Sequence, residues 1–120
     1  MMRLFILLVV LAGALVIWSA ERRVRADFAD AVAAYDGGDY AAALIDSLEA
    51  ARQGDVDAQY LAGFLYMRGE GTRRDLVRAY GWFTLAARQG DAFAADELIS
   101  LAKRMTAAQI SQARAGLFSD

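Results

Sequence analysis

The side chains that could do chemistry in this sequence are carboxylates, arginines, tyrosines and hydroxyls, because histidine and cysteine are both absent. The close acidic pairs are Asp96 with Glu97 and Asp55 with Asp57. A serine or threonine nucleophile would have no histidine to activate it. Carboxylates near the start of a helix are also explained by the helix dipole and its free N–H groups. We therefore expect no enzyme activity, no catalytic residue, no metal site and no cofactor.

The charge pattern argues against a nucleic-acid partner. From Asp27 onward the chain has nine basic and fourteen acidic residues, which leaves a net charge of −5. A protein that follows a phosphate backbone needs a stripe of basic side chains, and this sequence has none. Arginine outnumbers lysine twelve to one, which is typical of a bacterial gene of high GC content.

An apolar segment opens the chain. Residues 4–18 are fifteen apolar or small residues without a break, and Ser19 and Ala20 extend them to seventeen. That length is the lower limit for a helix that spans a bilayer, roughly 17 to 25 residues. Residues suited to the two membrane interfaces flank the segment: Arg3, Trp18, Arg22, Arg23 and Arg25. The pattern predicts a transmembrane anchor and a juxtamembrane basic segment over residues 1–25.

A cleaved signal peptide is the alternative interpretation of this segment. Trp18 stands two residues before Ala20, where cleavage favours a small residue, and the three arginines that follow hinder translocation. Both features favour an anchor that stays attached. The charges on the two sides of the span are nearly balanced once the α-amine is counted with Arg3. Orientation in a bacterial inner membrane stays open, with the periplasmic side slightly favoured for the rest of the chain.

Helical periodicity continues past the arginines. Gly13 and Gly37 have no glycine between them, and apolar residues recur there at spacings of three and four: Val24, Phe28, Val32 and Tyr35. The chain has no proline and is rich in alanine, so nothing interrupts a helix. We expect the anchor helix to run unbroken into the first helix of the next domain. Such a connection would hold that domain close to the lipid surface at a fixed angle.

An internal repeat divides the remaining chain into helices. Residues 50–55, with the sequence AARQGD, recur unchanged at residues 86–91, a displacement of 36 residues. A period in the thirties is typical of stacked helix–turn–helix units. Glycines punctuate helices of about ten to fourteen residues, and the aspartate after each glycine can cap the next helix: Asp39, Asp55 and Asp91. Thr106 with Gln109 matches a capping box and predicts a last helix over residues 107 to about 117.

The repeat also has the motif of a known family. Residues 57–66 (DAQYLAGFLY), the loop glycines at 69 and 71, and residues 86–90 (AARQG) together resemble one complete Sel-one-like repeat, a variant of the tetratricopeptide repeat. Residues 27–53 are similar to a shorter first repeat of that family, and Met105 to Gln109 resembles its terminal cap. The resemblance implies an all-α domain over residues 26–120. Its fold would be a short α/α superhelix of tetratricopeptide-like helical hairpins, about two repeats plus a C-terminal capping helix, following one transmembrane helix.

The motif residues have structural explanations. Small residues would let neighbouring helices approach closely: Ala58, Gly63, Ala79, Ala86 and Ala87. Aromatic residues would fill the space between hairpins, with Trp82 as a large buried ring: Tyr66, Trp82 and Phe83. Glycines with positive φ would turn the loop or end a helix: Gly54, Gly69, Gly71 and Gly90.

Partner binding would use the concave face that the first helix of each hairpin builds in this family. If Ala58, Ala62 and Leu65 are buried, the opposite side of that helix presents Asp57, Leu61, Phe64 and Arg68. The matching row of the next unit is Phe93, Glu97, Ser100 and Arg104. Leu61 and Phe93 are apolar where the family commonly has a polar residue, which indicates contact with a partner or lipid; alternatively, Phe93 packs beneath the first helix or the anchor. The candidate protein-binding residues are Leu61, Phe64, Arg68, Phe93 and Glu97.

These observations predict a membrane-anchored adaptor or assembly scaffold that holds a protein partner near the lipid bilayer. The alternative is a permanent single-pass accessory subunit of a larger bacterial membrane complex, with its apolar helix packed against other transmembrane subunits. Small residues at positions 12–14 would permit close helix contact, although the segment has no full G-x-x-x-G motif.

Retention of the apolar segment is a testable outcome. The intact mass of the protein extracted from membranes should include residues 1–20, because Trp18 disfavours cleavage and the arginines after it disfavour export. N-terminal sequencing of the same sample provides an independent check. A mature chain that starts near Glu21 or Asp27 would instead identify an exported protein without an anchor.

Overall fold

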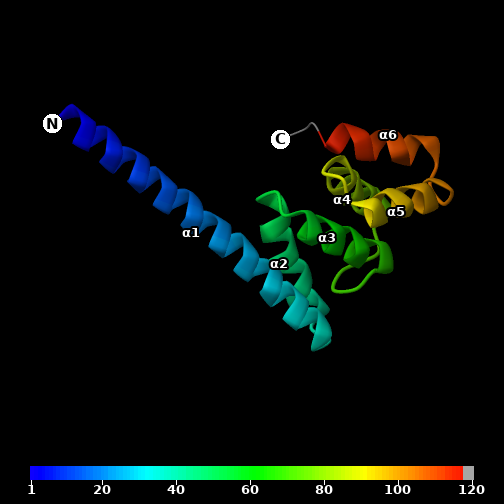
Figure 1. Ribbon diagram of the computed structural model, residues 1–120. Helices are drawn as coiled ribbons and strands as arrows, with labels where there is room; N and C mark the ends of the chain where they lie inside the picture. The colour runs from blue at the N-terminus through cyan, green and yellow to red at the C-terminus, as the bar shows by residue number, and fades with distance from the viewer. Residues whose placement is uncertain (118–120) are drawn as a thin grey trace.

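The computed structural model describes residues 1–117, and every element in that range is a helix. The helices are α1 (Met2–Asp36), α2 (Tyr40–Arg52), α3 (Val56–Arg68), α4 (Leu76–Arg88), α5 (Ala92–Ala102) and α6 (Ala107–Gly116). Packing joins α1 to α2, α2 to α3 and α3 to α4, while α5 and α6 both pack on α4 (Figure 1). This arrangement confirms the predicted all-α array of helical hairpins. The last three residues of the predicted domain, 118–120, lie outside the described residues.

Helix α1 has two halves with different surroundings. The N-terminal half stands clear of the other helices (Figure 1), and its large apolar side chains from residue 4 to residue 18 are 53% to 68% exposed. Its most apolar 18-residue window has a mean hydropathy of 2.4 with no part buried, so length and composition would allow it to cross a membrane. The C-terminal half packs against α2. The predicted continuity is confirmed, because one helix covers both halves.

The packing contacts of the repeat domain begin within α1. Val24 and Phe28 lie against a small cluster of buried alanines: Ala50, Ala51 and Ala58. Val24 belongs to the range 1–25 that the sequence assigns to the anchor, and α1 has no break between the two predicted domains. Anchor and domain therefore share one helix, and the division at residue 25 stays a prediction.

Residues 53–55 form a tight joint between α2 and α3. Gly54 has a φ of +94°. Its N–H donates to the Ala51 carbonyl at 3.0 Å, and the Asp55 N–H donates to the Ala50 carbonyl at 3.2 Å, which is the hydrogen-bond pattern of a Schellman cap. The Asp55 carboxylate then accepts from the Ala58 N–H at 2.8 Å. One glycine thus ends a helix, and the next residue caps the following one.

The same joint recurs at residues 90–91 and 38–39, with the aspartate accepting from the Ala94 N–H at 2.8 Å and from the Ala42 N–H at 3.1 Å. The Gly–Asp pair that ends each AARQGD segment makes this joint, and the same pair makes it at residues 38–39, where the preceding residues differ. The sequence encodes a helix end and a helix start in adjacent residues. The predicted capping box at residues 106–109 is also present and starts α6.

Small residues let neighbouring helices approach closely. Ala58, Ala79 and Ala86 are completely buried. A Cβ atom added to Gly63 would lie 2.9 Å from carbon atoms of the Phe83 ring, so the ring occupies the space that a larger residue would need. The predicted close-packing role is confirmed for these four positions, whereas Ala87 is only half-buried.

The predicted burial of Trp82 is wrong in degree. Trp82 is half-buried and packs against two clusters, one around Phe83 and the other around the alanines that contact Val24 and Phe28. The completely buried ring is Phe83. Consecutive helix residues point about 100° apart, so the Phe83 ring faces the centre of the core while the Trp82 ring packs at its edge.

Substitutions at these two rings test this placement. Phe83→Ala should lower the free energy of unfolding by about 3 to 5 kcal/mol, because it leaves a cavity in the core. Trp82→Ala should cost less, because part of its ring is already in contact with solvent. Thermal melts of the full chain in mild detergent, followed by circular dichroism, would measure both. A larger loss of stability for Trp82→Ala would contradict the assignment.

Candidate protein-binding surface

A line of aromatic rings runs over α1, the start of α2, α3 and α5. The rings are Tyr40 on α2, Tyr35 on α1, Phe64 and Tyr60 on α3, and Phe93 on α5. In this order, neighbouring ring centroids are 5.2, 6.3, 6.3 and 6.4 Å apart. Aromatic rings attract one another at such separations. We call these five residues the aromatic strip.

The strip is half-buried at its centre and exposed at its ends, where Tyr40 at one end is 36% exposed. Tyr60 and Phe64 are half-buried, and the Tyr60 ring lies 5.5 Å from the buried Phe83 ring. Phe93, at the other end, is 74% exposed. Phe93 therefore does not pack beneath the first helix or the anchor, and its contact with a partner or lipid stays a prediction. Tyr60 contacts a core aromatic ring, and Phe93 beside it is mostly in contact with solvent. Such an exposed apolar ring suits a surface that a partner covers.

Helix α3 positions the centre of the strip by its periodicity. Tyr60, Phe64 and Arg68 are spaced by four residues and lie along one side of the helix. The opposite side carries Ala58, Ala62 and Leu65, which are completely buried, as predicted. The core therefore fixes how α3 is turned about its axis, and this rotation places Tyr60 and Phe64 at the edge of the core, where the Tyr60 ring packs on Phe83 of α4.

Leu61 is less exposed than the sequence predicts. It is half-buried and packs against the core, as Phe64 also does. Leu61 precedes Phe64 by three residues and Leu65 by four, so it lies at the boundary between the strip side and the buried side of α3. Its role in protein binding stays a prediction.

A polar group borders the strip at Phe64. Arg68 forms an ion pair with Glu70, with 3.1 Å between Nε and Oε1, and its side chain is 55% exposed. The Arg68 guanidinium carbon also lies 5.4 Å from the centroid of the Phe64 ring. Arg68 is thus engaged within the chain, and its role in protein binding stays a prediction. An ion pair at the protein surface contributes about 0 to 1 kcal/mol, and the Glu70 side chain of this pair is only 21% exposed.

The α3–α4 loop places Glu70 in this position. Gly69 and Gly71 have φ values of +68° and +75°, which confirms the predicted turn. A Cβ atom at Gly71 would overlap the Tyr40 carbonyl, so the loop lies directly against the start of α2. Glu70 is consequently close to Tyr35: burial, and then the negative charge of Glu70, raise the pKa of the Tyr35 hydroxyl.

Carboxylates border the other end of the strip. Glu97 is half-buried on α5, four residues after Phe93, and Asp91 caps the start of that helix. Burial, and then the negative charges of Glu97 and Asp91, raise the pKa of Tyr60. The structure therefore brings four predicted residues to the strip: Phe64, Arg68, Phe93 and Glu97. Sequence reasoning missed four others: Tyr35, Tyr40, Tyr60 and Glu70. The spacing of four between Tyr60 and Phe64 was a usable signal, whereas the rest are brought near only by tertiary packing.

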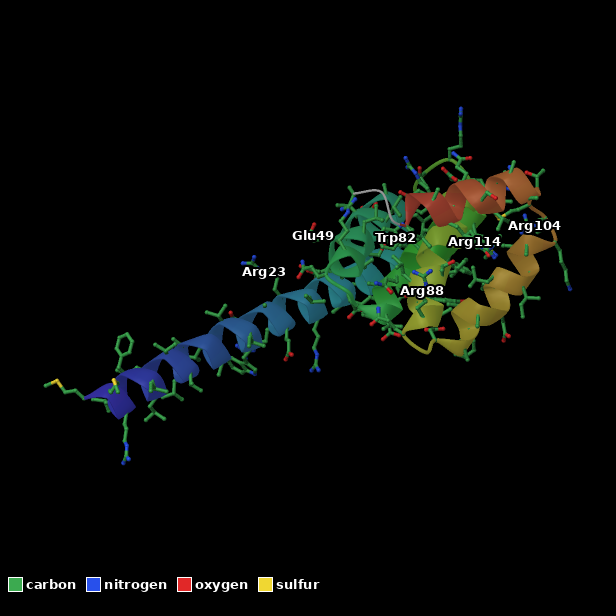
Figure 2. All side chains as sticks on the ribbon, turned by 90° about the horizontal axis from the view of Figure 1, so that it is seen from above. Arg23, Glu49, Trp82, Arg88, Arg104 and Arg114 are labelled. Carbon is green, nitrogen blue, oxygen red and sulfur yellow. The ribbon has the colours of Figure 1, made fainter. Side chains whose placement is uncertain are left out.

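The predicted membrane-interface residues flank the free half of α1. Arg3 is exposed at one end, and Arg22, Arg23 and Arg25 are exposed at the other. The Arg22 guanidinium carbon lies 4.1 Å from the centroid of the Trp18 ring, within cation–π range. Arg23 projects from α1 between its free and packed halves (Figure 2).

The acidic pairs noted in the sequence do not gather into a metal site. Among residues 1–117, no group of three or more carboxylates is arranged to hold a metal ion. Asp55 is engaged as the cap of α3, and Asp57 and Asp96 are exposed. These carboxylates act as helix caps or surface charges.

The different environments of Leu61 and Phe93 predict different effects on stability. Leu61→Glu should lower the free energy of unfolding by about 1 to 3 kcal/mol, because it places a charge against the core. Phe93→Glu should change it by about 0.5 kcal/mol or less, because the ring is mostly in solvent. Thermal unfolding of the two variants and the parent chain would measure this contrast. Equal melting temperatures for the two variants would contradict this contrast and would show that Leu61 is as exposed as Phe93.

Comparison with known proteins supports the repeat assignment. Residues 56–91 match the family model of the Sel1 repeat. Searches of curated proteins and of solved structures return no match to the chain. The matched segment runs from the first residue of α3, through the glycine loop, to the aspartate that caps α5, and so includes the centre of the aromatic strip. Sel1 repeats mediate protein–protein interaction. The chain therefore contains a Sel1 repeat, at residues 56–91, within an all-helical array.

Proposed function

We propose that this protein is a membrane-anchored adaptor or assembly scaffold that holds a partner protein on the aromatic strip. The observation that carries the proposal is the Phe93 end of the strip, where this ring is 74% exposed yet continuous with rings that pack on the core. Helical repeats bind partners on the extended surface that their stacked units build. The strip lies on such a surface, because α1, α3 and α5 each contribute to it.

The free half of α1 supports the anchor. Its apolar side chains have no partner within residues 1–117, and an aromatic and basic group at Trp18 and Arg22 suits a membrane interface. We propose that residues 1–25 form a single-pass anchor in a bacterial inner membrane and that residues 26–120 form the repeat domain. Tyr35 is 17 positions after Trp18, about 25 Å along a continuous helix at 1.5 Å per residue. The strip would then begin about 25 Å from the membrane interface.

Site-specific crosslinking tests the binding surface in cells. A photoreactive amino acid at Phe93 should form an adduct of one defined mass with the partner. The matched control is Ile45, which is 67% exposed and lies about 140° around α2 from Tyr40. Ile45 should form no such adduct. Adducts of equal yield at both positions, or an adduct at Ile45 alone, would move the partner to another surface.

The accessory-subunit alternative has an observation of its own. A Cβ atom at Gly13 would have nothing within 4 Å, so the small residues at positions 12–14 leave one side of α1 open to another helix. Purification in mild detergent separates the two functions. Co-migration with other subunits at a fixed stoichiometry would favour a permanent subunit, whereas loss of the partner on washing would favour the adaptor.

A further inference from the structure

The charges that border the aromatic strip are mostly negative. Glu97 follows Phe93 by four residues and so lies on the same side of α5, and Asp91 caps the start of that helix. Glu70 belongs to the loop that lies directly against the start of α2. Arg68, beside Phe64, is paired with Glu70. These four groups have a net charge of −2, and the chain from Asp27 onward has a net charge of −5. A partner that brings further carboxylates to this surface would meet repulsion along most of its length.

Glu70 is engaged within the chain. Its Oε1 atom accepts from the Arg68 Nε–H at 3.1 Å, and its carboxylate lies beside the Tyr35 hydroxyl, whose pKa it helps to raise. Arg68 therefore offsets the charge of Glu70 at this end of the strip. The carboxylates that can attract a further cation lie toward the Phe93 end, at Glu97 and Asp91.

The strip already holds a cation within the chain. The Arg68 guanidinium lies over the Phe64 ring at 5.4 Å, and this ring is continuous with Tyr60 and Phe93. The face of an aromatic ring is electrostatically negative, so it attracts guanidinium and ammonium groups. Phe93 is 74% exposed and lies in the same strip as Tyr60, which Glu97 borders, but it has no cation of this kind among its described contacts.

We propose that the partner segment on the aromatic strip is a basic stretch of protein, whose arginine or lysine side chains lie over the rings between Tyr60 and Phe93 and pair with Glu97. This inference rests on the proposed function, which supplies the binding surface. Ring faces bordered by carboxylates recognise such a segment in two ways, through cation–π attraction and through ion pairing. Anionic lipid is disfavoured as the occupant, because its phosphates would face the same carboxylates.

Selection from a random dodecapeptide display library tests the chemistry of the partner and does not require its identity. The bait is the full chain in phosphatidylcholine nanodiscs, and binders that also bind the Phe93→Ser variant are removed. The remaining, strip-dependent peptides should be enriched in arginine and lysine over aspartate and glutamate, relative to the starting library. Glu97→Gln should then weaken one such peptide by about two- to fivefold. The matched control, Asp96→Asn, removes the same charge from an exposed neighbour on α5 and should leave the affinity unchanged.

The possible outcomes separate the two proposals. Strip-dependent peptides without basic enrichment would overturn the inference about the partner's charge, while leaving the strip as the binding surface. Peptides that bind the parent chain and Phe93→Ser equally well would overturn both proposals. Equal losses for Glu97→Gln and Asp96→Asn would show that net charge, and not the carboxylate beside Tyr60, attracts the basic peptide, and would also overturn the inference.

Discussion

The packing of α1 against α2 is the interaction on which the rest of the structure depends. Val24 and Phe28 contact buried alanines there, and Ala31, one turn further along α1, is completely buried. Full burial of a large apolar side chain contributes about 1.5 to 3 kcal/mol, and these two are only partly buried. A domain of this size has a total stability of about 5 to 15 kcal/mol. A few side chains on this one helix are therefore a substantial part of what keeps the first hairpin together.

The same helix couples the proposed anchor to the proposed binding surface. Tyr35, near the C-terminal end of α1, contributes a ring to the strip and contacts both Tyr40 and Phe64. If α1 separated from α2, the strip would lose this end, and Glu70 would lose its neighbouring hydroxyl. The tight glycine–aspartate joints further along the chain also help to keep the rings of the aromatic strip together. These joints add almost no loop between α2 and α3 or between α4 and α5. The helices therefore follow one another closely, and the rings of α1, α3 and α5 stay within contact distance.

Features of the fold that depend on local sequence were predictable. The caps at Asp55 and Asp91, the glycine turns and the unbroken α1 follow from hydrogen-bonding groups a few residues apart. Features that depend on how a helix is rotated about its axis, or on contacts between residues far apart in the sequence, were not predictable. Trp82 and Leu61 each lie next to a fully buried position, and spacing alone does not show which neighbour faces the core. Glu70 enters the candidate surface only because the loop glycines hold it against the first hairpin, a contact between segments about thirty residues apart in sequence.

One continuous helix connects the proposed anchor to the binding domain and sets the distance between them, and this connection can be measured directly. The chain has no cysteine, so spin labels at Ser19→Cys and Asp36→Cys, both exposed on α1, can be introduced without other substitutions. Pulsed electron paramagnetic resonance in nanodiscs would then measure the distance between the two labels. We expect a single narrow distribution near 25 Å, as about 17 residues of α-helix require, broadened only by the label linkers. A broad or bimodal distribution would show a hinge within α1 and would contradict the rigid connection.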